Sequence, residues 1–93
     1  MVKVHGNYCG PNWTAGQNKP ASMIDDLPYV APIDRLDAGC LVHDRECKNG
    51  CTAKADRKLR NVALSVAATN PRLRPIALFV ALGMEGAART RRK

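Results

Sequence analysis

Apolar residues recur at helical spacing in three segments of this chain, but they show no sustained period in the first 31 residues. Segment 34–47 carries one apolar stripe at helical spacing, and segment 53–69 carries a second. Segment 75–88 is apolar on nearly all its sides, so it should either pack over the first two helices or expose a patch for a partner or a lipid. The pattern therefore predicts a mainly α fold, with three helices after an irregular N-terminal segment.

Capping and breaking residues set the expected helix ends. Asp34 follows Pro32 and can cap the first helix, and Asp37 three residues later makes the pattern resemble a capping box. Residues 48–50 should break this helix because they contain Gly50, and Thr52 can cap the next one. Since the connection is so short, the two helices should run antiparallel.

An antiparallel hairpin would place His43 opposite Asp56, because the two are almost symmetric about the turn near residues 49–50. His43 lies in the first apolar stripe, and Asp56 lies at the border of the second, where a carboxylate is costly unless a partner pairs with it. A carboxylate that holds one imidazole nitrogen leaves the other free to take a proton from water. Two interpretations stay open: a catalytic base with its orienting carboxylate, or a hydrogen-bonded core pair that fixes the hairpin.

Four cysteines in 93 residues indicate one small domain stabilised by disulfides. They allow three pairings, and Cys47 and Cys51 flank the helix turn closely enough to bond. Disulfides predict an oxidising compartment, or a particle that leaves the cell. The alternative is a zinc site in a reducing compartment.

The charge and the hydropathy narrow the class of partner. A net charge of +7 favours anionic partners, either nucleic acid or the head groups of acidic lipids, and does not choose between them. Part of this charge lies in residues 89–93, which we expect to be a frayed, solvated end. The first residues lack the apolar core of a secretory signal. The longest apolar run, residues 76–84, is about half the ~20 residues that a membrane span needs, so we expect a soluble protein.

A second candidate group joins Asp44, which follows His43 directly, to residues 8–12, which read Tyr-Cys-Gly-Pro-Asn. Calcium requires several oxygen ligands, and alternate carbonyls of an irregular, glycine-containing loop supply them well. If this loop folds over Asp44, the two form a calcium site. Otherwise the loop is an ordinary turn and Asp44 is a solvated surface residue.

Residues 32–44 read Pro-Ile-Asp-Arg-Leu-Asp-Ala-Gly-Cys-Leu-Val-His-Asp and resemble the active-site helix of the secreted, calcium-dependent phospholipases A2. Residues 8–12 resemble the calcium loop of that family, and residues 55–59 match its second long helix. The short connection between the helices, without a β-wing, is similar to the compact phospholipase A2 domains of parvovirus capsid proteins. The match covers residues 8–12 and 32–67, about half of the chain.

This resemblance implies a phospholipase A2-like fold, in which an N-terminal calcium loop and a C-terminal apolar helix accompany two antiparallel, disulfide-tied active-site helices. It implies calcium-dependent hydrolysis of the sn-2 ester of glycerophospholipids at a membrane surface of anionic character, by a secreted or virion-associated protein that requires no nucleic acid. His43 would activate a water, and Asp56 would orient His43. The implied Ca²⁺ ligands are loop carbonyls and one carboxylate: Tyr8, Gly10, Asn12 and Asp44. The cation and the Gly10 amide would stabilise the oxyanion.

The family also links its loop to its first helix, which implies a Cys9–Cys40 disulfide in this chain. We predict Cys47–Cys51 as the second bridge. The whole chain is expected to form one domain with four parts: 1–31 with the calcium loop, 32–69 as the catalytic hairpin, 70–88 as the last helix and 89–93 as the basic tail.

Two other functions stay open. A catalytically inactive phospholipase-like module would bind a membrane or a protein, and it would bind calcium without turnover. A zinc-stabilised, basic nucleic-acid-binding domain would use the ligands Cys40, His43, Cys47 and Cys51. Against the zinc domain, the chain has no Cys-x2-Cys pair. Thiol titration discriminates, because two disulfides leave no thiols and a zinc site leaves four after denaturation.

Overall fold

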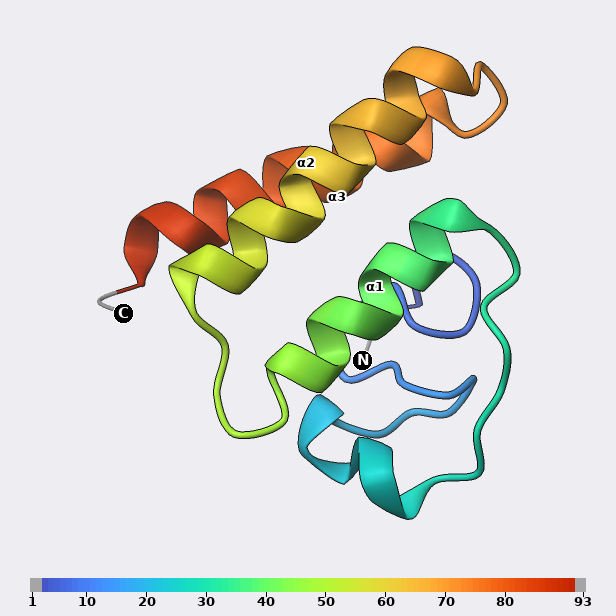
Figure 1. The fold of residues 1–93 in the computed structure, drawn as a ribbon, viewed down its shortest axis with the longest axis vertical. Helices are drawn as coiled ribbons and strands as arrows, with labels where there is room; N and C mark the ends of the chain where they lie inside the picture. The colour runs from blue at the N-terminus through green and yellow to red at the C-terminus, as the bar shows by residue number, and fades with distance from the viewer. Residues whose placement is uncertain (1–2, 92–93) are drawn as a thin grey trace.

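The computed structural model describes residues 3–91, and three α-helices dominate it (Figure 1). α1 spans Arg35–Glu46, α2 spans Ala53–Thr69 and α3 spans Arg74–Thr90. Over residues 3–91 there is no β-strand, only two isolated bridges. The predicted mainly α fold with two disulfides is therefore confirmed.

The residues that the sequence indicated as caps begin α1 and α2. The Asp34 carboxylate accepts a hydrogen bond from the backbone N–H of Asp37 (2.9 Å), and the Thr52 hydroxyl accepts one from the backbone N–H of Ala55 (3.1 Å). The capping box is incomplete, because the Asp37 carboxylate accepts N–H groups from residues that precede Asp34 rather than from Asp34 itself.

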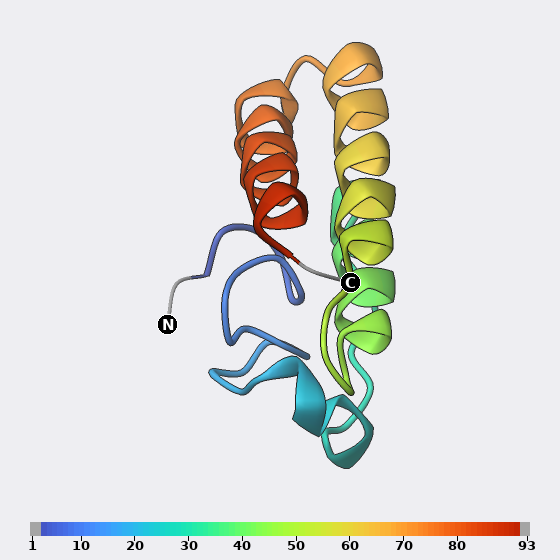
Figure 2. The ribbon, with the colours of Figure 1, turned by 90° about the vertical axis from the view of Figure 1, so that its left-hand side faces the viewer.

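Each helix runs antiparallel to the next, as Figures 1 and 2 show. At one end of the α1–α2 hairpin, the Arg35 guanidinium donates a hydrogen bond to the Ser65 hydroxyl (2.8 Å). α2 and α3 stand side by side along their length in Figure 2, and an ion pair between Arg60 and Glu85 (2.6 Å) fixes their register. The antiparallel arrangement that the short turn predicted for α1 and α2 is confirmed.

α2 lies at the centre of the core because it packs against both other helices. Gly39 permits a close approach of α1 to α2, since a Cβ added there would lie 2.9 Å from the Val62 side chain. The fully buried Leu36 contributes to the core from α1, and burial of such a side chain stabilises the fold by about 2 kcal/mol. α3 packs against α2, and the residues that it buries are small or branched: Ala77, Val80, Ala81 and Ala88.

The outward face of α3 is also apolar. Leu78, Phe79 and Leu82 are 44%, 66% and 74% exposed. The last helix therefore both packs over the hairpin and exposes a patch, the two outcomes that its pattern left open. Across residues 3–91, no helix combines the length and the apolar content that crossing a bilayer requires.

The N-terminal segment contains one element that the sequence did not indicate. A short 3-10 helix, η1 (Ala21–Asp26), interrupts the predicted loop and buries Ile24. Six residues in a 3-10 helix make about two turns, too few for a period to appear in the sequence. The first two residues of the predicted segment lie outside the described ones.

Two disulfides stabilise this small domain. Cys9–Cys40 ties the N-terminal segment to α1, and Cys47–Cys51 spans the turn between α1 and α2, so both predicted pairings are confirmed. All four cysteine sulfurs are consumed in these bonds. The zinc hypothesis required thiolates, and it is wrong for this reason.

The prediction that residues 89–93 form a frayed, solvated end is wrong for residues 89–91. Arg89 lies within α3 and forms an ion pair with Glu85 (2.8 Å). Arg91, the C-cap residue that follows α3, forms an ion pair with Asp56. The last two residues of the predicted tail lie outside the described part of the chain.

Candidate active site

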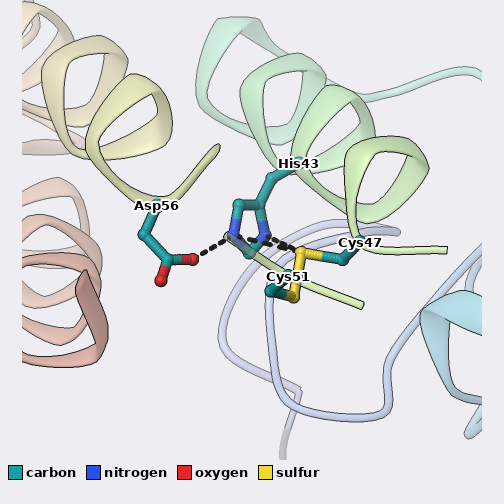
Figure 3. A group of neighbouring side chains, drawn as sticks. All are labelled: His43, Cys47, Cys51 and Asp56. Atoms are coloured by element: carbon teal, nitrogen blue, oxygen red, sulfur yellow. Dashed lines mark hydrogen bonds and ion pairs between the residues drawn. A yellow bond between two sulfur atoms is a disulfide. The ribbon is translucent and has the colours of Figure 1, made fainter. Parts of the chain in front are cut away.

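His43 on α1 and Asp56 on α2 face each other across the hairpin, as Figure 3 shows. Nε2 of His43 lies 2.7 Å from Oδ1 of Asp56. The Asp56 side chain is fully buried, and the His43 side chain is 12% exposed. The pairing predicted from the positions of these residues about the turn is confirmed, whereas their catalytic roles stay predictions.

The hydrogen bond selects one tautomer of the His43 imidazole. An ionised carboxylate can only accept, so Nε2 must carry the hydrogen that the bond requires. In a neutral ring, Nδ1 then keeps its lone pair and can act as an acceptor. This is the arrangement of a base held by an orienting carboxylate, and the partial exposure of His43 lets water reach the ring.

The Cys47–Cys51 disulfide lies beside the imidazole (Figure 3). Sγ of Cys47 is 3.5 Å from Nε2 of His43 and 3.8 Å from Nδ1. A disulfide sulfur has no hydrogen to donate, so it leaves the Nδ1 lone pair free. His43, Cys47, Cys51 and Asp56 bring their donor atoms within 4.8 Å of one another. However, both sulfurs are bonded to each other, and the remaining two groups already share a hydrogen bond, so this cluster is poorly suited to a metal ion.

The second oxygen of the buried Asp56 carboxylate accepts a hydrogen bond from Nε of Arg91. The two Asp56 oxygens therefore have different partners, one on α1 and one at the end of α3. Sequence reasoning missed Arg91 because its charge was assigned to a solvated tail. The one available signal was the antiparallel order of α2 and α3, which brings the end of α3 back towards the first turn of α2.

Asp44 is buried, at 9% exposed, and is therefore not the solvated surface residue of the alternative interpretation. Its Oδ2 accepts a hydrogen bond from the Thr14 hydroxyl (3.1 Å). Burial raises the pKa of the Asp44 carboxyl to about 7, the nearby Asp37 carboxylate raises it further, and the Thr14 hydrogen bond partly opposes the rise. Among residues 3–91, Asp44 is thus a buried acid whose one hydrogen-bond partner is neutral, an environment that would favour a cation.

Asp37 ties the N-terminal loop to α1 from a fully buried position. Its carboxylate accepts backbone N–H groups from Asn7 (2.9 and 3.1 Å), Tyr8 (2.8 Å) and Ile33 (2.9 Å). The loop approaches so closely at Gly6 that an added Cβ would lie 2.4 Å from the Asp37 carboxyl carbon. The sequence presented Asp37 only as a capping residue, and no local pattern showed that it would hold a distant loop.

Residues 9–14 are attached to α1 at two points one turn apart. The Cys9–Cys40 disulfide is the first attachment, and the Thr14–Asp44 hydrogen bond is the second. Between them the backbone takes positive φ angles at Gly10 (140°) and Asn12 (52°), conformations that glycine and asparagine tolerate better than most residues.

Of the four predicted calcium ligands, Asp44 lies against this loop, which also contains Gly10 and Asn12. Tyr8, the fourth, is 2% exposed and donates its hydroxyl to the Val30 carbonyl (2.6 Å). The structure therefore attaches Thr14, two residues after the predicted loop, to the predicted carboxylate. Binding of calcium by the loop and the carboxylate stays a prediction.

A second His–Asp pair offers an internal comparison. Nε2 of His5 lies 2.6 Å from Oδ2 of Asp34, and the His5 side chain is 12% exposed, as is that of His43. Asp34, however, is 26% exposed and caps α1. The His5 pair therefore serves as a natural control for the His43–Asp56 pair, with the same chemistry in a more solvated setting.

Comparison with known proteins assigns the chain to no family: no family model matches it, and neither does any curated protein or solved structure.

Proposed function

We propose that this protein is a calcium-dependent phospholipase A2 that hydrolyses the sn-2 ester of glycerophospholipids at a membrane surface. The observation that carries this proposal is the His43–Asp56 pair, whose fully buried carboxylate engages Nε2 of a partly exposed imidazole and leaves its Nδ1 without a carboxylate partner. Asp44, the residue after His43 on α1, and the loop attached to it would supply the second half of the site, the calcium site.

In the proposed reaction, Nδ1 of His43 takes a proton from a water molecule while the water oxygen attacks the ester carbonyl carbon. The carbonyl electron pair moves onto its oxygen, and in this proposal the Gly10 backbone N–H would donate to that oxyanion. When the intermediate collapses, the bond to the glycerol oxygen breaks and that oxygen takes the proton back from His43. Asp56 holds the ring in one tautomer throughout and stabilises the imidazolium.

The residues around Asp44 fit a hard divalent cation. Calcium binds oxygen ligands from carboxylates and backbone carbonyls, and its charge would favour the ionised form of a carboxyl whose pKa burial raises to about 7. Asp44 would hold the ion with the carbonyls of Tyr8, Gly10 and Asn12. When bound, calcium would supply positive charge that stabilises the oxyanion of the ester.

Action at an anionic membrane is supported by the outward face of α3, which we call the apolar face and which comprises Leu78, Phe79 and Leu82. Between Asp56 and Glu85 the chain contains no acidic residue, whereas it contains five basic ones: Arg57, Lys58, Arg60, Arg72 and Arg74. An exposed apolar face beside a stretch whose only charged residues are basic is suited to an interface of anionic lipids. The two disulfides favour a secreted or virion-associated location.

The test is release of fatty acid from vesicles of sn-2-labelled phospholipid, with calcium and with excess chelator. We expect calcium-dependent release from the wild type and none from His43→Gln. His5→Gln is the matched control, because it removes an equally exposed histidine that also pairs with an aspartate, and it should keep its activity. Equal loss in both variants would contradict the proposed role of His43.

The other outcomes distinguish the alternatives. Calcium binding by calorimetry without fatty acid release from any vesicle would refute catalysis and indicate an inactive membrane- or protein-binding module. Neither binding nor release would refute both halves of the proposal.

A further inference from the structure

The fully buried Asp56 carboxylate has one partner that the proposed reaction does not use. Oδ1 accepts from His43, and Oδ2 accepts from Nε of Arg91, whose side chain is 32% exposed. Both carboxylate oxygens are therefore engaged, and the two hydrogen bonds together fix the rotation of the carboxylate. A change at either partner would free that rotation.

Arg91 is delivered to this position by the fold rather than by the local sequence. It is the C-cap residue of α3, which packs against α2 and buries Ala77, Ala81 and Ala88. The Arg60–Glu85 ion pair joins the same two helices, four residues further along α2 and six residues before Arg91, and it holds the same register. The end of α3 is thus fixed relative to the first turn of α2, where Asp56 lies.

We propose that Arg91 is a positioning residue of the dyad, which holds the Asp56 carboxylate in the orientation that selects the His43 tautomer. The loss of kcat that this inference predicts rests on the proposed hydrolase function, whereas the predicted change in the His43 tautomer does not depend on it. A guanidinium suits the task because its planar N–H groups have fixed directions and its charge is permanent. It also compensates the charge of a carboxylate that would otherwise be buried beside a neutral imidazole.

A purely structural role for Arg91 makes a different prediction. If the ion pair only fastened α3 to α2, its removal would lower stability without a specific effect on His43. Positioning predicts that the folded variant loses kcat and that its His43 ring no longer keeps a single tautomer.

The kinetic test compares Arg91→Met, Arg91→Lys and Arg89→Met on sn-2-labelled vesicles, well below the unfolding temperature of each variant. Arg89→Met is the matched control, because it removes an arginine two residues away that pairs with Glu85 on the surface. We expect Arg91→Met to lose on the order of 10²-fold in kcat with little change in apparent KM, as misplacement of a catalytic group does. Arg91→Lys should recover part of this loss. Equal kcat for Arg91→Met and Arg89→Met would overturn the proposal.

The spectroscopic test needs no turnover. At a single pH, nitrogen NMR of the imidazole rings reports which nitrogen carries the hydrogen, and His5→Gln assigns the His43 signals because the chain has two histidines. We expect one His43 tautomer in the wild type and a mixture of tautomers in folded Arg91→Met. An unchanged His43 signature in that variant would overturn the proposal.

If Arg91→Met does not fold, the wild type still tests the contact on which the proposal depends. The Nε–H resonance of Arg91 should exchange slowly with water because it donates to a buried carboxylate, whereas that of Arg89 should exchange fast. Equal exchange rates would overturn the proposal. A wild type that releases no fatty acid would refute the proposed hydrolase function, while the tautomer measurement would still decide the role of Arg91.

Discussion

Replacing Asp44 by asparagine should stabilise the calcium-free protein at pH 8. The pKa of this carboxyl rises from 3.8 to about 7 on folding, because the side chain is buried. The folded state therefore binds a proton more tightly than the unfolded chain does. As a result, the stability of the wild type falls as the pH rises from about 4 to about 7, and it stays at the lower level above that range.

The magnitude follows from the two pKa values. Each tenfold difference in proton affinity corresponds to about 1.4 kcal/mol, so the ionised Asp44 costs the folded state about 4 kcal/mol at pH 8. Asparagine has nearly the same shape and can still accept the Thr14 hydroxyl, so the variant should avoid this cost. The excess stability of Asp44→Asn over the wild type should shrink as the pH falls and should vanish below about pH 4.

The assay is chemical denaturation with excess chelator at several pH values between 4 and 8. Asp26→Asn is the matched control, because Asp26 is exposed and its replacement should change stability little. Calcium at 100 times its dissociation constant should add about 2.7 kcal/mol to the wild type and nothing to Asp44→Asn. A stability difference between Asp44→Asn and wild type that does not vary with pH would refute the reasoning.

Asp37→Asn should lower the free energy of unfolding, measured by chemical denaturation, by about 3 kcal/mol, because a charged acceptor of loop N–H groups is lost. A loss below about 1 kcal/mol would contradict this role of Asp37. Cys9→Ser should lower the free energy of unfolding by about 4 kcal/mol and Cys51→Ser by about 2 kcal/mol, because their disulfides close loops of 31 and 4 residues. Cys9→Ser should also weaken calcium binding, measured by calorimetry, more than Cys51→Ser does. Equal effects on calcium binding would argue against this. Phe79→Ser should weaken binding to anionic vesicles about tenfold relative to Tyr29→Ser. Tyr29→Ser is the control, because it removes an equally exposed aromatic side chain outside the apolar face. Equal vesicle affinities of the two variants would exclude the apolar face as the membrane-binding surface.

The helices, their caps and the His43–Asp56 pairing could be predicted because each depends on local periodicity or on symmetry about a short turn. A residue at helical spacing must lie on a known face, and a short connection leaves two helices little choice but to run antiparallel. Those two rules were enough to predict that a histidine of α1 pairs with an aspartate of α2. The short η1 helix escaped because its few residues produce no period.

The functions of Arg91, Asp37 and Thr14 could not be predicted in the same way. Each acts on a residue about 30 positions away, and nothing in the neighbouring sequence encodes such a distance. The tail illustrates the difference, because a run of basic residues is usually solvated, whereas the packing of α3 on α2 brings Arg91 to a buried carboxylate.

The sequence by itself therefore determined the helices, the cysteine count, the basic charge and the candidate dyad, since these follow from local spacing and composition. The tertiary structure alone decided which groups are buried together. It gave Asp44 its raised pKa, attached the loop to α1 at Cys9 and Thr14, and supplied Asp56 with Arg91. The physical reason is that desolvation and long-range hydrogen bonds depend on distances between segments, which only the packing of the helices fixes.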